Sequence, residues 1–204
     1  MSSRPLSRRL AILAVGAAAA SAAAPAPASA SDAQCPVSPV SSPFAAWGDN
    51  ADYKLVADVE DEGASWSLGG GAGAQAGNQT FMVGGASDAS SLRLPSGGSA
   101  TTPQTCIGSE HPSFRFFAKR TGGSPEARLV VEVVYSDAAG AEHAVQAGIV
   151  EGSWAWAPSG ALPTIVDELA ARRGSAVDAA FRFTPQGGGL WSIDDVYVDP
   201  HRII

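Results

Sequence analysis

The chain has 204 residues and a formal net charge of −7, from 20 acidic and 13 basic side chains. Because it is acidic and has no basic cluster, we expect neither nucleic acid nor an anionic membrane surface as a partner. The length suits a single domain with a sizeable hydrophobic core.

Residues 1–30 have the pattern of a signal peptide that is removed on export. Arg4, Arg8 and Arg9 precede an apolar run over residues 10–20, and a small-residue cleavage site follows at 28–30. The adjacent arginines also fit a twin-arginine signal, so the export route stays open. The apolar run is shorter than the roughly 18 residues of a membrane span. We therefore expect a secreted, extracellular protein without a transmembrane anchor, whose residues 31–204 form a single domain.

Two cysteines, Cys35 and Cys106, are the only ones in the chain. In an oxidising extracellular compartment two thiols tend to pair, so the sequence predicts a disulfide between them. A catalytic cysteine is the alternative, although neither residue lies in a recognisable nucleophile motif.

Short strands separated by Gly-, Ser- and Pro-rich connections dominate the rest of the chain, which is typical of an all-β sandwich. The expected strands, in chain order, are residues 53–59, 65–68, 80–83, 91–94, 113–119, 128–135, 141–150, 177–184 and 191–198. The glycine run at 69–77 is expected to be a loop or a flat strand, because no helix follows it as a dinucleotide-binding motif requires. We expect an antiparallel β-sandwich of jelly-roll type.

One short helix at most is predicted, in the segment LPTIVDELAARRG at residues 162–174. Thr164 can cap it, Asp167 stands at the capping-box position, and Gly174 can end it. In the strand predicted at 177–184, alternation places one set of apolar residues on the core face: Val177, Ala179, Phe181 and Phe183.

The last predicted strand, WSIDDVYV, carries two adjacent aspartates, and its apolar residues change faces across Asp194 and Asp195. A single β-bulge at this pair would return the apolar residues Ile193, Val196 and Val198 to one core face. The displaced carboxylates would then need partners such as calcium, backbone N–H groups or Arg182.

Candidate catalytic residues are few. The three histidines show no metal-ligand spacing, and no nucleophile elbow occurs. The acidic stretch at 58–62 fails the pattern of an EF-hand loop and is typical of a solvated surface. We therefore expect a protein that is not an enzyme, with a hydrolase that uses paired carboxylates in a sandwich groove as the alternative.

Trp154 and Trp156 would share one face of a strand in the segment SWAWAP. Exposed tryptophan rings stack on the apolar faces of sugars, so this pair is the candidate ligand-binding site. Tryptophans in a small sandwich also commonly pack in the core or at its rim.

Several segments carry a resemblance to a group of secreted proteins of actinobacteria: CPVSPVSSPFAAWGDNADYKLV, SLRLPSG, FRFFA, FRFTP and WSIDDVYVDP. That group resembles the galactose-binding-domain-like β-sandwiches, which include many carbohydrate-binding modules. The resemblance implies a structural calcium ion held by an acidic residue after the first strand and an aspartate of the last strand. The matching positions are Glu60 and Asp194 or Asp195, with Val59 where the family commonly has phenylalanine.

The sequence thus predicts a secreted, non-catalytic binding module whose partner is a polysaccharide or cell-envelope glycan, with calcium as a structural ion. The ligand class rests on the resemblance of fold, which is compatible with many functions. A structural surface protein without a small-molecule ligand is the other alternative.

Overall fold

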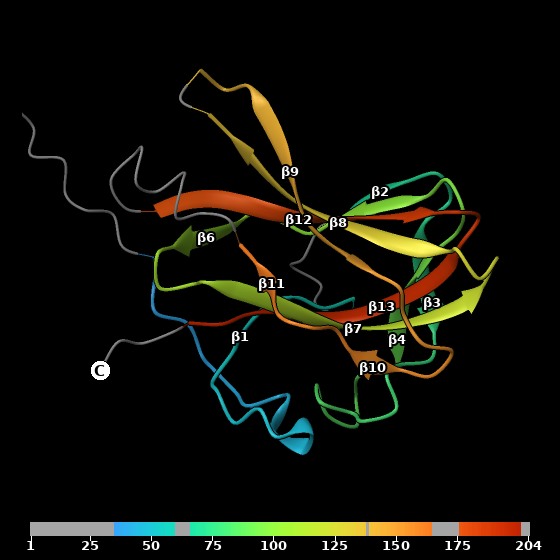
Figure 1. Ribbon diagram of the computed structural model, residues 1–204. Helices are drawn as coiled ribbons and strands as arrows, with labels where there is room; N and C mark the ends of the chain where they lie inside the picture. Colours follow the sequence, from blue (N-terminus) through green and yellow to red (C-terminus); the bar gives the residue numbers. More distant parts are fainter. Residues whose placement is uncertain (1–34, 60–65, 138, 165–175, 201–204) are drawn as a thin grey trace, which may run out of the picture. The chain divides into compact units, whose positions relative to one another are not determined.

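Two antiparallel sheets face each other in the computed structural model, which describes residues 35–59, 66–137, 139–164 and 176–200 (Figure 1). The seven-stranded sheet consists of β1 (Lys54–Ala57), β3 (Gly73–Ala76), β4 (Ser90–Leu94), β7 (Ser113–Gly122), β10 (Ala157–Pro158), β11 (Leu162–Pro163) and β13 (Leu190–Val198). The six-stranded sheet consists of β2 (Ser67–Gly69), β5 (Ser99–Thr101), β6 (Thr105–Gly108), β8 (Arg128–Ser136), β9 (Glu142–Val150) and β12 (Ala176–Gln186). The predicted all-β antiparallel sandwich is confirmed.

The order of strands places β13 and β12 in the middle of their sheets. One sheet runs β10-β7-β13-β4-β3, with β1 also on β13 and β11 on β7. The other runs β2-β5-β12-β8-β9, with β6 also on β12. The predicted hairpin of residues 128–135 and 141–150 is confirmed as β8 and β9, which pair in register from Leu129–Val150 to Ser136–Glu142 with one bulge.

The core fills the space between the sheets with alternate residues of the long strands. Phe114 of β7 stacks on Phe181 of β12 at 4.0 Å between ring centroids, and Phe116 meets Phe183 edge-on at 4.9 Å. The predicted core face of β12 is confirmed, because Val177, Ala179, Phe181 and Phe183 are all buried in this cluster. Burial of these side chains is the main driving force for pairing the sheets.

The β-bulge predicted in the last strand is present. In the pairing of β13 with β7, Asp194 lies opposite Phe117 and Tyr197 lies opposite Arg115. The chain therefore advances by three residues on β13 where it advances by two on β7. Asp195 takes the left-handed conformation, with φ of 46°. As a result Ile193, Val196 and Val198 all belong to the core between the sheets.

A second apolar cluster lies on the outer face of the seven-stranded sheet and consists of Phe44, Tyr53, Phe117, Trp156 and Tyr197. The segment before β1, which contains the short 3-10 helix η1 (Ala45–Trp47), covers it.

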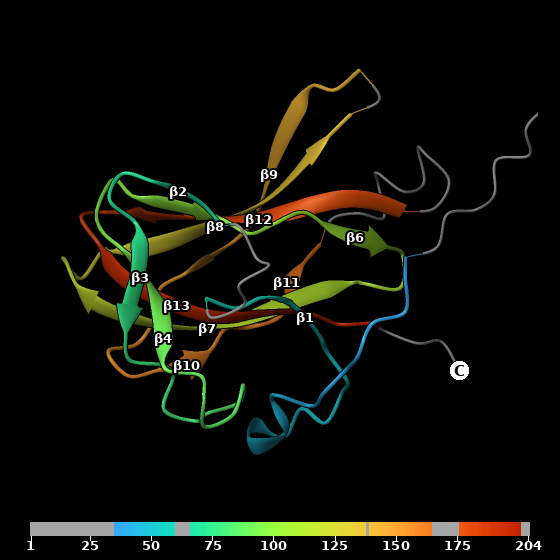
Figure 2. The same cartoon turned by 180° about the vertical axis from the view of Figure 1, so that it is seen from behind.

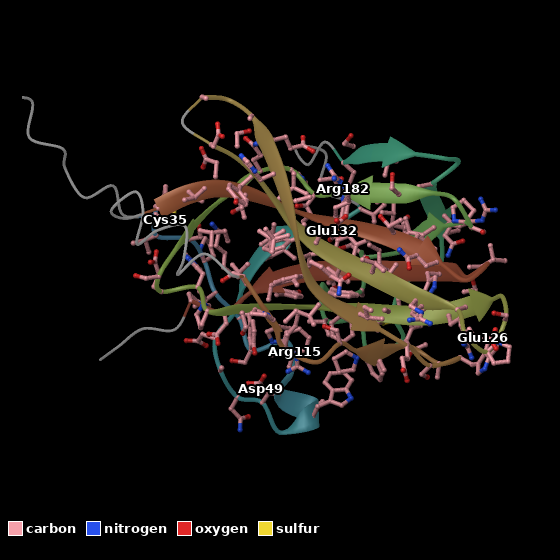
Figure 3. The ribbon with its side chains drawn as sticks, turned by 45° about the horizontal axis from the view of Figure 1, so that its top comes forward. Cys35, Asp49, Arg115, Glu126, Glu132 and Arg182 are labelled. Carbon is pink, nitrogen blue, oxygen red and sulfur yellow. A yellow bond between two sulfur atoms is a disulfide. The ribbon has the colours of Figure 1, made fainter. Side chains whose placement is uncertain are left out.

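An ion pair fastens this segment to the sheet: Arg115 Nη1 lies 2.6 Å from Asp49 Oδ2, as the labelled side chains show (Figure 3). The Tyr53 hydroxyl donates to the same oxygen at 2.7 Å. The outer face is therefore partly closed by its own chain.

The predicted disulfide between Cys35 and Cys106 is confirmed, with Cα atoms 5.5 Å apart. It ties the start of the described chain to β6 across a sequence separation of 71 residues. Closing a loop of that length stabilises the fold by roughly 4 kcal/mol on the chain-entropy model.

Some predicted elements differ in the structure. Residues 80–83 form turns instead of a strand, because the chain reverses there and Met82 adopts a φ of 50°. Leu162–Pro163 is the strand β11, and the hydroxyl group of Thr164, the predicted cap, donates to the carbonyl of His111. Residues 165–174 of the predicted helix lie outside the described residues, as does the predicted leader. No helix in the described part of the chain is long and apolar enough to span a membrane.

Candidate functional site

Three carboxylates from distant parts of the sequence meet beside the bulge of β13. Asp58 follows β1, Asp88 precedes β4, and Asp194 stands in β13. One carboxylate oxygen of each lies within 4.8 Å of those of the other two. Asp194 is 1% exposed and Asp88 7%, while Asp58 is half-buried. We call this group the aspartate cluster.

The loop between β3 and β4 supplies the neutral hydrogen-bond donors at this site. The backbone N–H of Gln79 donates to Asp194 Oδ2 at 3.0 Å, and its side-chain Nε2 donates to Asp195 Oδ2 at 3.4 Å. Asp194 Oδ1 is buried and has no hydrogen-bond partner among the described residues. A buried carboxylate oxygen without a partner is costly, so this atom is available to a ligand.

Burial raises the pKa of Asp194 to about 9 against the lowering effect of the Gln79 hydrogen bond. The negative charges of Asp195, Asp88 and Asp58 raise this pKa further. Such a carboxyl group becomes ionised near neutral pH only when a positive charge binds beside it. The site therefore favours either a proton or a cation.

The residues fit a hard divalent cation such as Ca²⁺. Calcium prefers six to eight oxygen ligands, above all carboxylates and backbone carbonyls, and tolerates irregular geometry. Asp58, Asp88 and Asp194 offer three such carboxylates with no nitrogen or sulfur donor among them.

The predicted metal ligands are only partly brought together. Asp194 is in the aspartate cluster, whereas Asp195 lies beside it, turned to the Gln79 side chain, and Glu60 lies outside the described residues. Sequence reasoning missed Asp88 and assigned Asp58 to a solvated surface. A signal for Asp58 existed, because it stands two residues before Glu60 in the acidic stretch.

Arg182 does not neutralise the aspartates, contrary to one predicted alternative. Its strand β12 belongs to the other sheet, and its Nη2 donates to Glu142 Oε1 at 2.7 Å. The backbone N–H alternative is confirmed for Asp194 by the bond from Gln79.

Trp154 and Trp156 do not share a strand face, so that part of the prediction is wrong. The chain bends at residues 154–155, before β10 begins at Ala157. Trp156 is 7% exposed and packs in the outer apolar cluster, whereas Trp154 is 63% exposed. Of these two tryptophans, only Trp154 presents its ring to solvent.

Arg120 contacts the ring of Trp154 and also lines a pocket. The guanidinium carbon lies 4.4 Å from the ring centroid, a cation–π contact that restrains the indole. Arg120 also lines a pocket of about 400 Å³ between the ends of β7 and β9 and the start of β8. The charged side chains of this pocket, called here the Trp154 pocket, are Arg120, Glu126, Arg128 and Glu151. Figure 3 shows Glu126 at the end of the sandwich opposite Cys35.

No protein-family model matches the chain, and no curated protein matches it significantly. Among solved structures, the chain is similar to the CBM22-1 xylan-binding domain from Paenibacillus barcinonensis, with a TM-score of 0.47 and 12% identity over 72% of this chain and 94% of that one.

A second solved structure contains the CBM22-1 and GH10 modules of a Clostridium thermocellum xylanase in complex with xylohexaose. The TM-score is 0.48 at 17% identity, and the match covers 73% of this chain but only 29% of that one. A carbohydrate-binding module of family 29 matches with a TM-score of 0.45 and 11% identity, over 74% of this chain and 89% of that one. These three similar structures are, or include, carbohydrate-binding modules, as the sequence resemblance implied.

Proposed function

We propose that this domain is a secreted, non-catalytic module that binds polysaccharide or cell-envelope glycan through the Trp154 pocket, and that calcium at the aspartate cluster stabilises it. The observation that carries the proposal is the exposed ring of Trp154 against Arg120, a residue that also lines a pocket with three further charged side chains.

The chemistry of this pocket suits a sugar. The apolar C–H face of a sugar ring stacks on an aromatic plane, and its hydroxyl groups need donors and acceptors beside that plane. Arg120 covers one face of the Trp154 ring, which leaves the opposite face of this 63% exposed side chain open. None of the ion pairs among the described residues involves the pocket's two arginines or two glutamates. Arg120 Nη1 and Arg128 Nε donate to backbone carbonyl groups, and the other guanidinium N–H groups and the two carboxylates can bond hydroxyl groups.

Replacing Trp154 tests this function. We expect Trp154→Ala to weaken binding of a soluble oligosaccharide about tenfold or more, because the stacking surface is lost. Isothermal titration with xylohexaose and cellohexaose, together with retention on insoluble xylan and cellulose, measures the effect. The matched control is Leu68→Ala, which removes an exposed apolar side chain from β2, at the edge of the six-stranded sheet opposite β9. Absence of retention on every glycan tested, or equal affinity of Trp154→Ala and the wild type, would contradict the proposal.

The calcium part of the proposal rests on Asp58, Asp88 and Asp194, which would hold the ion. When bound, it supplies a divalent positive charge beside the three carboxylates. The residues themselves then link the end of β1, the β3–β4 loop and β13.

Calcium titration of chelator-treated protein is expected to show one ion per chain. Asp194→Asn should abolish this binding, while Asp178→Asn, at an exposed aspartate of β12, should leave it unchanged.

A hydrolase is the second candidate, because Glu126 and Glu151 both line the Trp154 pocket. Both side chains are exposed, unlike the water-excluded carboxyl groups of most hydrolases. The same glycan incubations distinguish the two functions: a binding module releases no reducing ends. Hydrolysis would be established if the wild type released reducing ends and either Glu126→Gln or Glu151→Gln abolished this release.

A further inference from the structure

The loop between β3 and β4, residues 77–89, connects the aspartate cluster to a second aromatic surface. Figures 1 and 2 show this loop beside the short helix η1. At the tip of the loop, Phe81 meets Trp47 of η1 edge-on, with ring centroids 4.5 Å apart. Both rings also approach Phe117 beneath them, at 5.9 Å and 5.6 Å. Two separate segments of the chain thus complete one aromatic surface.

This surface borders a pocket of about 340 Å³ that is distinct from the Trp154 pocket and shares no lining residue with it. Its lining includes Ser41, Ser42, Pro43, Trp47, Phe81 and Val83. Trp47 remains 38% exposed and Phe81 43%, although each contacts the other. Aromatic carbon beside hydroxyl groups matches the two kinds of surface on a sugar ring. The volume lies near the lower end of the roughly 300–1,000 Å³ of small-ligand sites, which suits a small ligand such as one sugar ring.

Hydrogen bonds of Gln79 link the backbone of Phe81 to Asp194 and Asp195. Gln79 is 1% exposed and donates to Asp194 and Asp195, while its side-chain oxygen accepts the backbone N–H of Phe81 at 2.7 Å. At the other end of the loop stands Asp88, a member of the aspartate cluster. A chain of direct contacts therefore runs from the cluster to the aromatic ring.

Charge at the cluster acts on this loop. A divalent cation at the cluster draws the carboxylate of Asp88, on the loop, towards those of Asp58 and Asp194. Occupancy of the cluster therefore favours the loop position in which Phe81 lies against Trp47.

We propose that Trp47 and Phe81 form a second saccharide-stacking site, and that a divalent cation at the aspartate cluster is required to assemble it. The saccharide as ligand class rests on the proposed function. The coupling between the cation and the loop rests on the contacts of Gln79 and Asp88. The two aromatic surfaces would then bind separate sugar rings of one glycan or of two chains.

The test is a titration of xylohexaose and cellohexaose into the full protein, in calcium and in a chelator. We expect the wild type to lose affinity about tenfold on chelation. In calcium, Phe81→Ala should already have an affinity about tenfold below that of the wild type. The chelator should change the affinity of this variant by less than about threefold. Met82→Ala removes the neighbouring, 61% exposed side chain and should behave as the wild type.

Amide hydrogen exchange supplies a readout that needs no sugar. Calcium should slow exchange at residues 77–89 in the wild type and in Phe81→Ala alike, because the ion acts on the loop through Asp88. Unchanged exchange would overturn the coupling.

Wild-type affinity in Phe81→Ala, or an equal effect of chelation on both proteins, would overturn the second site while leaving the Trp154 pocket in place. Absence of all glycan binding by the wild type would overturn the proposed function and the second saccharide site together.

Discussion

With calcium removed by a chelator, the domain is expected to lose stability steadily as the pH rises from about 4 towards 9. In the folded protein the pKa of Asp194 is raised to about 9, above the ordinary aspartate value of 3.8. Between these values the folded state keeps a proton that the unfolded state has released. Raising the pH therefore favours unfolding. The protonated Asp194 contributes its full stabilisation below the pKa that this residue has in the unfolded protein, and this stabilisation is lost as the pH approaches its pKa in the folded protein.

Calcium should reverse this trend. The ion binds ionised carboxylates and competes with the proton on Asp194, so its affinity rises with pH. An ion at about a thousand times its dissociation constant stabilises the fold by about 4 kcal/mol. Melting temperatures between about pH 5 and pH 8, with chelator and with excess calcium, should therefore diverge as the pH rises.

Asp194→Asn separates this mechanism from a general effect of pH. Asparagine does not titrate, so in chelator the variant should show a flatter dependence of melting temperature on pH, and calcium should not raise its melting temperature. Asp178→Asn is the matched control, because that side chain is exposed in a regular strand. Equal pH slopes for Asp194→Asn and the wild type would contradict the assignment.

Inserting one alanine after Asp195 is expected to abolish folding, the largest effect of any single change considered. With one residue more after the bulge, alternation in β13 would turn Val196 and Val198 outwards and Tyr197 into the core. Both valines are completely buried, and Tyr197 packs in the cluster on the outer face. The insertion thus exchanges the faces of a strand that pairs with β1 and β7.

Two substitutions that keep the residue count serve as controls for this insertion. Asp195→Gly keeps the bulge and accepts a φ of 46° without strain, so it should fold. Asp195→Val adds a β-branched side chain in the left-handed region and should cost about 1–3 kcal/mol more than glycine. Urea unfolding followed by circular dichroism measures all three variants. A cooperative transition near that of the wild type in the insertion variant would contradict the argument, because it would show that the bulge can take up a further residue.

The alternation of side chains along a strand explains which features could be predicted from the sequence. The core face of β12 and the bulge of β13 were both visible because side chains in a strand alternate with a period of two. The disulfide was predictable because only one pairing of two cysteines exists. Very short strands such as β10 and β11 escaped prediction, since two residues carry no periodic signal and form a strand only because β7 lies beside them.

The sequence by itself determined the class of fold, which residues of the long strands face the core, and where β13 needs a bulge. Only the tertiary structure decided what surrounds that place. Asp58 and Asp88 lie far from Asp194 along the chain, and no local pattern encodes their approach. The two tryptophans differ in exposure for the same reason. Trp156 is buried on the outer face of the seven-stranded sheet beneath residues that precede β1, whereas Trp154 contacts Arg120 and remains exposed to solvent. Convergence and exposure depend on how the sheets and loops pack, which is a property of the whole domain.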